Sequence, residues 1–216
     1  MANVQIENRI RYYEILGVIL TALGKFIFMD FLNWRFPYVA TAVLIWLVYI
    51  LYRKRQTPGI LKYWGFRTDN FKKALTWVMP FGAFSIMVFF VIGFWQGSIH
   101  VTWHILPILI TYPIWGTIQQ FLLISLVTGN SKDSNLFGLK NWQIILGSAV
   151  LFSVVHYPSL WLMLGTFLLA LFYGFVFLKE RNVYVLGIFH GWLGAIFYYT
   201  VVGTDPFADT FLILVS

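Results

Sequence analysis

Seven long apolar segments divide the chain, and short clusters of charged residues separate them. An α-helix rises about 1.5 Å per residue, so about 20 apolar residues cross a hydrocarbon core of about 30 Å. The pattern therefore predicts an all-α fold class, a polytopic integral membrane helix bundle in which residues 1–216 form a single transmembrane domain. The expected transmembrane helices cover residues 13–32, 37–52, 73–95, 105–128, 142–158, 161–178 and 183–203.

Basic residues predict the orientation of the bundle, because Lys and Arg collect in the cytoplasmic loops of membrane proteins. On one side of the seven expected helices lie Arg9 and Arg11, the loop 53–73, Lys132 and Lys140, and Lys179 and Arg181. Arg35 is the only basic residue in the opposite loops. We therefore expect a cytoplasmic N-terminus, an external C-terminus, a basic cytoplasmic loop over 53–73, and a location in a prokaryotic plasma membrane.

Composition excludes several classes of protein. Hydrophobic residues make up 60% of the chain, charged residues make up 11%, and the mean hydropathy is +0.77, which is far from the composition of a soluble domain. The chain has no cysteine, which excludes disulfides and thiolate chemistry. The net charge of +7 falls in loops of the kind that direct insertion, so we expect the lipid bilayer and no nucleic acid as a partner. The sequence predicts no oligomeric state.

A few polar residues interrupt the apolar segments, and each is a functional-site hypothesis because polar groups in hydrocarbon need partners. We interpret Lys25 as snorkelling to the interface and Asp30 as a surface anchor or a partner near Arg35. The other polar residues lie on three helices, and we expect them to line one buried chamber; they are Gln119, Gln120, His156 and His190. Helical rise places Gln119 and His190 at one depth, whereas His156 agrees only if its helix is tilted or starts deeper.

His100 and His104 are four residues apart at the outer boundary of the fourth expected helix. This spacing is compatible with a metal pair, and an interfacial aromatic belt around Trp103 is the alternative interpretation. No cofactor is certain from the sequence. A divalent metal held by His156 and His190, with His100 or His104, remains one open hypothesis.

Three short motifs in residues 107–199 resemble the CPBP family, which contains type II CAAX prenyl endopeptidases and bacteriocin-processing or immunity membrane proteins. That family carries Glu-Glu-x3-Arg on one helix, Phe-x3-His on the next, and His-x3-Asn or His-x3-Asp two helices later. Phe152 and His156 complete the second motif, and His190 begins the third. The chain departs from the family at Gln119 and Gln120, which replace the two glutamates, and also at Ile124 and Gly194, which replace Arg and Asn or Asp.

The resemblance implies an intramembrane endopeptidase in which a glutamate activates water and the histidines bind water and oxyanion. Gln119 and Gln120 cannot supply that base, because a neutral amide has no useful proton affinity near pH 7. We therefore expect a pseudoenzyme-like chamber for a lipid-like, prenylated or peptide ligand, with Phe152, Ser153 and Gly194 beside it. The alternatives are a histidine- or metal-dependent membrane enzyme on a hydrophobic substrate, and a non-catalytic immunity or partner protein.

Overall fold

The computed structural model describes residues 4–209, and every regular element in this part of the chain is helical. The expected all-α class is therefore confirmed. The elements are α1 (Asn8–Gly24), η1 (Lys25–Phe31), α2 (Arg35–Gln56), α3 (Ile60–Tyr63), α4 (Phe71–Gln96), α5 (Ile105–Gln120), η2 (Phe121–Gly129), α6 (Asn130–Asp133), η3 (Leu136–Gly138), α7 (Asn141–Val154), α8 (Leu160–Glu180), α9 (Val183–Phe197) and η4 (Tyr198–Val202).

Each apolar segment of the sequence corresponds to one of these helices or to two that run on from each other. Within the described residues, five helical segments are long and apolar enough to cross a membrane: Arg35–Gln56, Phe71–Gln96, Ile105–Asp133, Leu160–Glu180 and Val183–Val202. Asn141–Val154 is apolar but shorter. The chain thus has the composition and helices of an integral membrane protein, whereas the expected count of seven spans remains a prediction.

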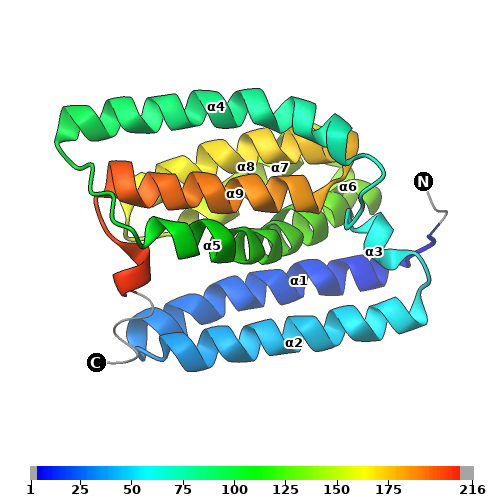
Figure 1. Ribbon diagram of the computed structural model, residues 1–216. Coiled ribbons are helices and arrows are strands. Elements are labelled where there is room, and N and C mark those ends of the chain that lie inside the picture. The colour runs from blue at the N-terminus through cyan, green and yellow to red at the C-terminus, as the bar shows by residue number, and fades with distance from the viewer. Residues whose placement is uncertain (1–3, 210–216) are drawn as a thin grey trace.

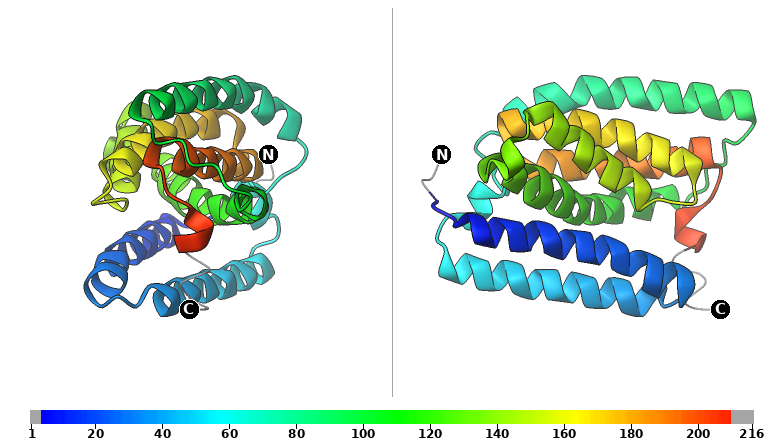
Figure 2. Two further views of the ribbon diagram at one scale, coloured as in Figure 1. Left: turned by 60° about the vertical axis from the view of Figure 1, so that its left-hand side comes forward. Right: turned by 180° about the vertical axis from the view of Figure 1, so that it is seen from behind.

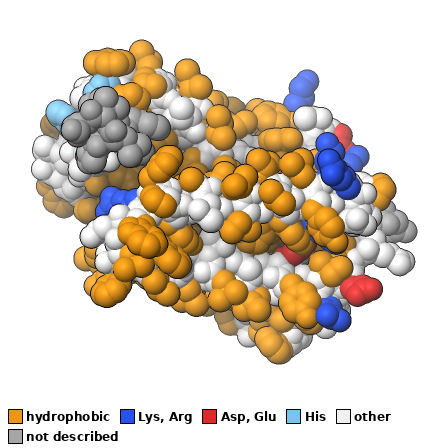
Figure 3. Space-filling model, turned by 90° about the horizontal axis from the view of Figure 1, so that it is seen from below, with side chains coloured by type: hydrophobic (Ala, Val, Ile, Leu, Met, Phe, Trp, Pro, Cys, Tyr) orange, Lys and Arg blue, Asp and Glu red, His pale blue; other side chains and the backbone are white. Residues whose placement is uncertain are grey.

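Helices α5 and α9 lie side by side in the centre of the bundle, as both views in Figure 2 show. Helices α4, α7 and α8 lie on one side of this pair, and α1 and α2 form an antiparallel hairpin on the other side (Figure 1). The hairpin exposes many large apolar side chains, including Leu20, Leu44 and Ile45. Figure 3 shows hydrophobic side chains spread over this face. Such a surface suits contact with lipid chains.

Glycines allow α5 and α9 to approach each other closely. A Cβ atom at Gly191 would collide with the backbone of Tyr112 and Pro113, and one at Gly187 would collide with Thr117. Gly187 and Gly191 are four residues apart on one helical face, which is the spacing of small residues that lets membrane helices pack backbone to backbone. The close approach fixes α9, and with it His190, against the end of α5.

Polar contacts join several basic segments at one end of the bundle. The Nε atom of Arg11 donates to the hydroxyl of Tyr63 at 3.3 Å, and that hydroxyl donates to Asp133. An Nη2 atom of Arg181 donates to the same carboxylate at 2.5 Å. Burial and the neighbouring Asp133 raise the pKa of Tyr63, so its hydroxyl keeps its proton and remains a donor. The first helix, the loop 53–73 and the α8–α9 turn therefore meet at one end.

Candidate functional site

The side chains of Gln120 and His190 form the central polar contact between α5 and α9. Gln120 is fully buried, and its Nε2 atom lies 2.5 Å from Nδ1 of His190. An amide nitrogen only donates, so Nδ1 of His190 accepts and the proton of the neutral imidazole lies on Nε2. A glutamate in place of Gln120 would accept from Nδ1–H and leave Nε2 as the basic atom. The glutamine amide in this orientation pairs with the tautomer that a glutamate would not favour, and turned by 180° it would pair with the other tautomer.

His156 lies in the turn between α7 and α8, two residues beyond the end of α7. Its Nδ1 atom donates to the carbonyl of Phe152 at 2.7 Å, which leaves Nε2 as an acceptor. The ring centroid of Phe152 is 4.9 Å from that of His156 and 5.4 Å from that of His190. The expected helix 142–158 was wrong at its end, because α7 stops at Val154. A helix of 14 residues spans about 21 Å, which is less than the thickness of a hydrocarbon core of about 30 Å, so the chain turns before a full crossing.

Two adjoining cavities lie beside the residues that were expected to line one chamber. A cavity of about 140 Å³ is lined by Gln119, His156, His190 and Gly194 among others. A larger cavity of about 480 Å³ lies between the α1–α2 hairpin and the helices α5 and α7, and Phe152 lines it. Gln119 and His156 line both cavities, together with Trp115, Leu162 and Tyr198. The structure thus brings together Gln119, Gln120, His156 and His190.

Gly194 occupies the place of the third-motif Asn or Asp. A Cβ atom at this position would lie 3.9 Å from Cδ2 of His190, which is ordinary van der Waals contact. A side chain at position 194 would therefore face the imidazole, and its absence leaves part of the smaller cavity open.

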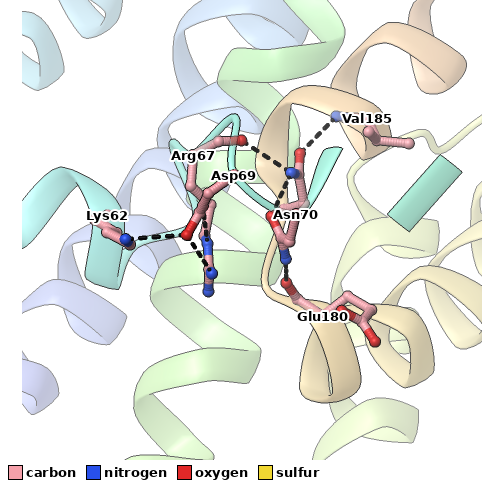
Figure 4. Close-up of polar contacts among 7 residues, drawn as sticks. Lys62, Arg67, Asp69, Asn70, Glu180 and Val185 are labelled. Carbon is pink, nitrogen blue, oxygen red and sulfur yellow. Dashed lines mark hydrogen bonds and ion pairs between the residues drawn. The ribbon is translucent and has the colours of Figure 1, made fainter. Parts of the chain in front are cut away.

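A network of hydrogen bonds fixes the start of α9, two turns before His190 (Figure 4). Asn182 caps the helix by accepting from the backbone N–H of Val185 at 3.0 Å. Its Nδ2 atom donates to the carbonyl of Arg67 at 2.9 Å and to Oδ1 of Asn70 at 2.8 Å. Asn70 in turn donates to the carbonyl of Glu180. The loop before α4 and the α8–α9 turn therefore fix the position of the N-terminal end of α9 in the bundle.

Lys25 and Asp30 form an ion pair of 2.6 Å at the edge of the larger cavity. The Nζ atom of Lys25 also donates to the carbonyl of Tyr157 at 2.9 Å, next to His156. Asp30 thus pairs with Lys25 rather than with Arg35, although Arg35 lines the same cavity. Lys25 was interpreted as a snorkelling residue, and the structure shows that its ammonium group faces this cavity.

Ser153 lies outside the linings of both cavities. Its hydroxyl donates to the carbonyl of Met163 at 2.9 Å and so joins α7 to α8.

His104 lies in a separate polar cluster beyond the C-terminal end of α9. Its Nδ1 atom is 2.6 Å from a carboxylate oxygen of Asp205, and that oxygen also accepts from Thr102 at 2.7 Å. Burial raises the pKa of Asp205, but hydrogen bonds from Thr102, His104 and Tyr199 outweigh burial and hold it below its usual range. His100 is exposed. Within residues 4–209, no three or more His, Cys, Asp or Glu side chains are grouped closely enough to hold a metal ion.

Sequence reasoning missed Tyr112, Trp115 and Thr166 among the residues that line the smaller cavity. Tyr112 and Trp115 are seven and four residues before Gln119, so they share its helical face, and this periodicity was a usable signal. Thr166 lies in α8, which the sequence presents as an apolar helix. Its hydroxyl donates to the carbonyl of Leu162 at 2.7 Å, and no pattern in the sequence singles it out.

Comparison with known proteins matches one segment of the chain to a protein family. Residues 102–196, a little under half of the chain, match the family model described as Type II CAAX prenyl endopeptidase Rce1-like. No curated protein and no solved structure matches the chain significantly. The matched segment contains Gln119, Gln120, His156 and His190, so the resemblance that the three motifs indicated is confirmed, and this segment is of the CPBP type.

Proposed function

We propose that this CPBP-type membrane protein binds a hydrophobic, lipid-like or prenylated ligand in its two adjoining cavities and does not carry out glutamate-dependent peptide hydrolysis. The observation that carries the proposal is the larger cavity. It encloses about 480 Å³ and meets the polar residues Gln119 and His156 at the boundary with the smaller cavity. A volume of this size is typical of small-molecule sites, which span about 300–1,000 Å³.

The larger cavity suits an apolar chain. Most of its lining is aliphatic or aromatic, and much of it comes from α1, α2, α5 and η2, including Val18, Ala22, Val39, Val43, Ile118 and Leu122. A prenyl or acyl chain in this space would exchange lipid contacts for protein contacts. Affinity would then depend on the fit of the chain and on the polar group at its end.

Three polar side chains are available to that polar group. His190 offers Nε2–H as a donor, and His156 offers Nε2 as an acceptor, and neither atom has a hydrogen-bond partner among residues 4–209. The amide of Gln119 offers both a donor and an acceptor, and it also has no partner in that part of the chain. These side chains together offer hydrogen-bond donors and acceptors to a hydroxyl, ester or amide group of a ligand.

Peptide hydrolysis by the family mechanism needs a carboxylate base, and Gln119 and Gln120 offer none. In the tautomer that pairs with Nε2 of Gln120, Nε2 of His190 is a donor and does not accept a proton from water. Nε2 of His156 is the remaining basic atom. This observation favours, as the second candidate function, a hydrolase that uses His156 as its base; removal of a general base from such an enzyme costs about 10² to 10⁴ in rate.

The proposal includes an orientation with the N-terminus in the cytoplasm and the C-terminus outside, in a prokaryotic plasma membrane. It is supported by the basic segments that contacts of Arg11 and Arg181 bring to one end of the bundle. Arg35 begins α2 at the opposite end of the hairpin. The positive-inside rule assigns the end that carries more basic residues to the cytoplasm.

The binding test uses the purified chain in nanodiscs of zwitterionic lipid and measures equilibrium binding of tritiated farnesol. We expect saturable binding that Gln119→Leu and His156→Ala each weaken by roughly 3- to 10-fold, the value of one hydrogen bond of about 0.5–1.5 kcal/mol. Gln96→Leu and His100→Ala are matched controls, because both residues are exposed and line neither cavity. Binding that does not saturate, or that all four variants change equally, would contradict the proposal.

A second measurement separates binding from hydrolysis. The wild type and the double variant Gln119→Glu with Gln120→Glu are incubated with a farnesylated CAAX peptide, and products are identified by mass spectrometry. We expect no cleavage by the wild type and measurable cleavage by the double variant. Cleavage by the wild type that His156→Ala abolishes would instead establish the histidine-dependent enzyme.

A further inference from the structure

The charged residues of the larger cavity gather at one end of it. Lys25 and Asp30 lie in η1, Arg35 begins α2, and Tyr157 lies in the turn that carries His156. The hydrogen bond from Lys25 to the carbonyl of Tyr157 ties these elements together. The rest of the lining is mostly apolar and comes mainly from α1, α2, α5, η2 and α7. The cavity therefore has one charged end and a larger, mostly apolar part.

The charges at this end do not balance. The ammonium group of Lys25 is paired with Asp30 at 2.6 Å, and these two charges compensate each other. The guanidinium group of Arg35 has no hydrogen bond or ion pair with any residue in 4–209, and Arg35 is exposed. Arg35 therefore marks the place where the cavity opens to the surface, and the cavity-lining residues carry one positive charge without a partner.

An unpaired cation at the surface opening of an apolar cavity is positioned to bind an anionic group of a ligand whose chain enters the cavity. A guanidinium group presents a planar set of donors that matches phosphate, and charge-assisted hydrogen bonds are about twice as strong as neutral ones. Lys25 uses two of its three ammonium protons on Asp30 and Tyr157, so one remains for the same anion. Gln119 and His156 line the same cavity and offer hydrogen bonds to the group that joins head and chain.

We propose that the occupant of the larger cavity is a single-chain lipid with a phosphate head group, and that Arg35 and Lys25 bind this head group at the mouth of the cavity. This inference rests on the proposed function and names the class of its ligand. The lipid chain would occupy the apolar part of the cavity, and the phosphate would supply the negative charge that Asp30 alone does not provide.

The test compares farnesyl monophosphate with farnesol, which has the same chain and no charge. Both are measured against the wild type in nanodiscs of zwitterionic lipid at fixed ionic strength. We expect the phosphate to bind at least about 10-fold more tightly than the alcohol, in line with a charged hydrogen bond. Arg35→Gln should remove most of this preference and leave farnesol binding unchanged, and Arg35→Lys should retain most of it.

Arg55→Gln is the matched control, because Arg55 is an exposed arginine near the other end of α2 and lines neither cavity. Equal affinity of the wild type for the two ligands would overturn this inference and leave the proposed function standing. Equal loss of phosphate binding in Arg35→Gln and Arg55→Gln would also overturn it, since the effect would then be general surface charge. Failure of both ligands to bind saturably would overturn both proposals. Full displacement of the lipid by inorganic phosphate would assign the site to free phosphate and overturn the lipid assignment.

Discussion

The segment that matches the endopeptidase family and the helices that precede it bury their side chains to very different extents. In the helical segment Val183–Val202, 56% of the residues in its most apolar part are buried. In Arg35–Gln56 the buried share of the corresponding part is 6%. Helices α5 and α9 meet through glycines, while the α1–α2 hairpin leaves a cavity of about 480 Å³ beside them. Lipid chains are as apolar as leucine, so a membrane hairpin gains little by burying apolar side chains. Close packing instead surrounds the buried polar pair of Gln120 and His190.

The buried carboxylate of Glu14 ties the hairpin to the rest of the bundle. It accepts from Tyr49 at 2.5 Å and from Asn130 at 2.6 Å, and Nε of Arg53 lies 3.7 Å away. We predict that Glu14→Ala lowers the free energy of unfolding by about 3–5 kcal/mol, because it leaves the buried charge of Arg53 unpaired. Denaturant titration in mild detergent, followed by tryptophan fluorescence, measures this loss. Glu7→Ala is the control.

Glu7 is exposed and its side chain makes no cap contact, so its removal should leave the unfolding midpoint within experimental error. A similar loss in both glutamate variants would show that the hairpin is not tied to the bundle through Glu14.

The packing of α5 on α9 is tested by Gly187→Ala. The added methyl group would collide with Thr117 on α5, and overpacking of this kind costs about 1–3 kcal/mol. Gly147→Ala is the matched control. Apart from the backbone of its own helix, no heavy atom lies within 4 Å of the position that the new Cβ would occupy. The same titration should show a loss for Gly187→Ala and a neutral or slightly stabilising effect for Gly147→Ala. The reverse order would refute the close packing.

The open space beside the hairpin is tested by filling it. Ala42 lines the larger cavity, whereas Ala40 is exposed on the same helix and does not line it. We predict that Ala42→Trp weakens farnesol binding at least about 10-fold, equivalent to about 1.4 kcal/mol, because the indole takes the space of the chain. Ala40→Trp should bind as the wild type does. Equal affinities of the two tryptophan variants would place the ligand elsewhere.

Sequence reasoning predicted the helices and the polar pair well, because both depend on local patterns. Apolar runs between charges located the helices, and the rarity of polar residues within those runs singled out Gln119, Gln120 and His190. The depth of His156 was not predictable in the same way. It depends on α7 stopping at Val154, and a run of apolar residues continues past that point without marking the turn.

The larger cavity and the contacts of Asn182 also escaped the sequence. An apolar side chain that faces lipid and one that faces a protein cavity follow the same helical pattern, so hydropathy could not show the gap beside the hairpin. Asn182 was overlooked because a single polar residue in a short turn is common. Its importance comes from the loop around Arg67 and Asn70, more than 100 residues earlier in the chain.

The smallest predicted effect concerns Asp69, which lies in the loop between α3 and α4 that also carries Arg67 and Asn70. Asp69 accepts from Arg67 at 2.8 and 2.9 Å and pairs with Lys62 at 2.9 Å (Figure 4). Hydrogen bonds from Arg67 and then Lys62 hold the pKa of Asp69 below its usual range. Stability from a lowered carboxyl pKa is present above the unfolded value of about 3.9 and is lost as the pH falls toward the folded value.

We therefore expect the wild type to be slightly more stable than Asp69→Asn at pH 7, and the two unfolding midpoints to converge as the pH falls below about 4. Denaturant titrations at several pH values measure the difference, and 0.5 M salt at pH 7 should reduce it, because exposed ion pairs are screened. A difference that stays constant with pH and salt would mean that Asp69 acts through the shape of the loop rather than through its charge. The loop would then be held at this end of the bundle by its other contacts, which include those of Asn70 with Asn182 and of Tyr63 with Asp133.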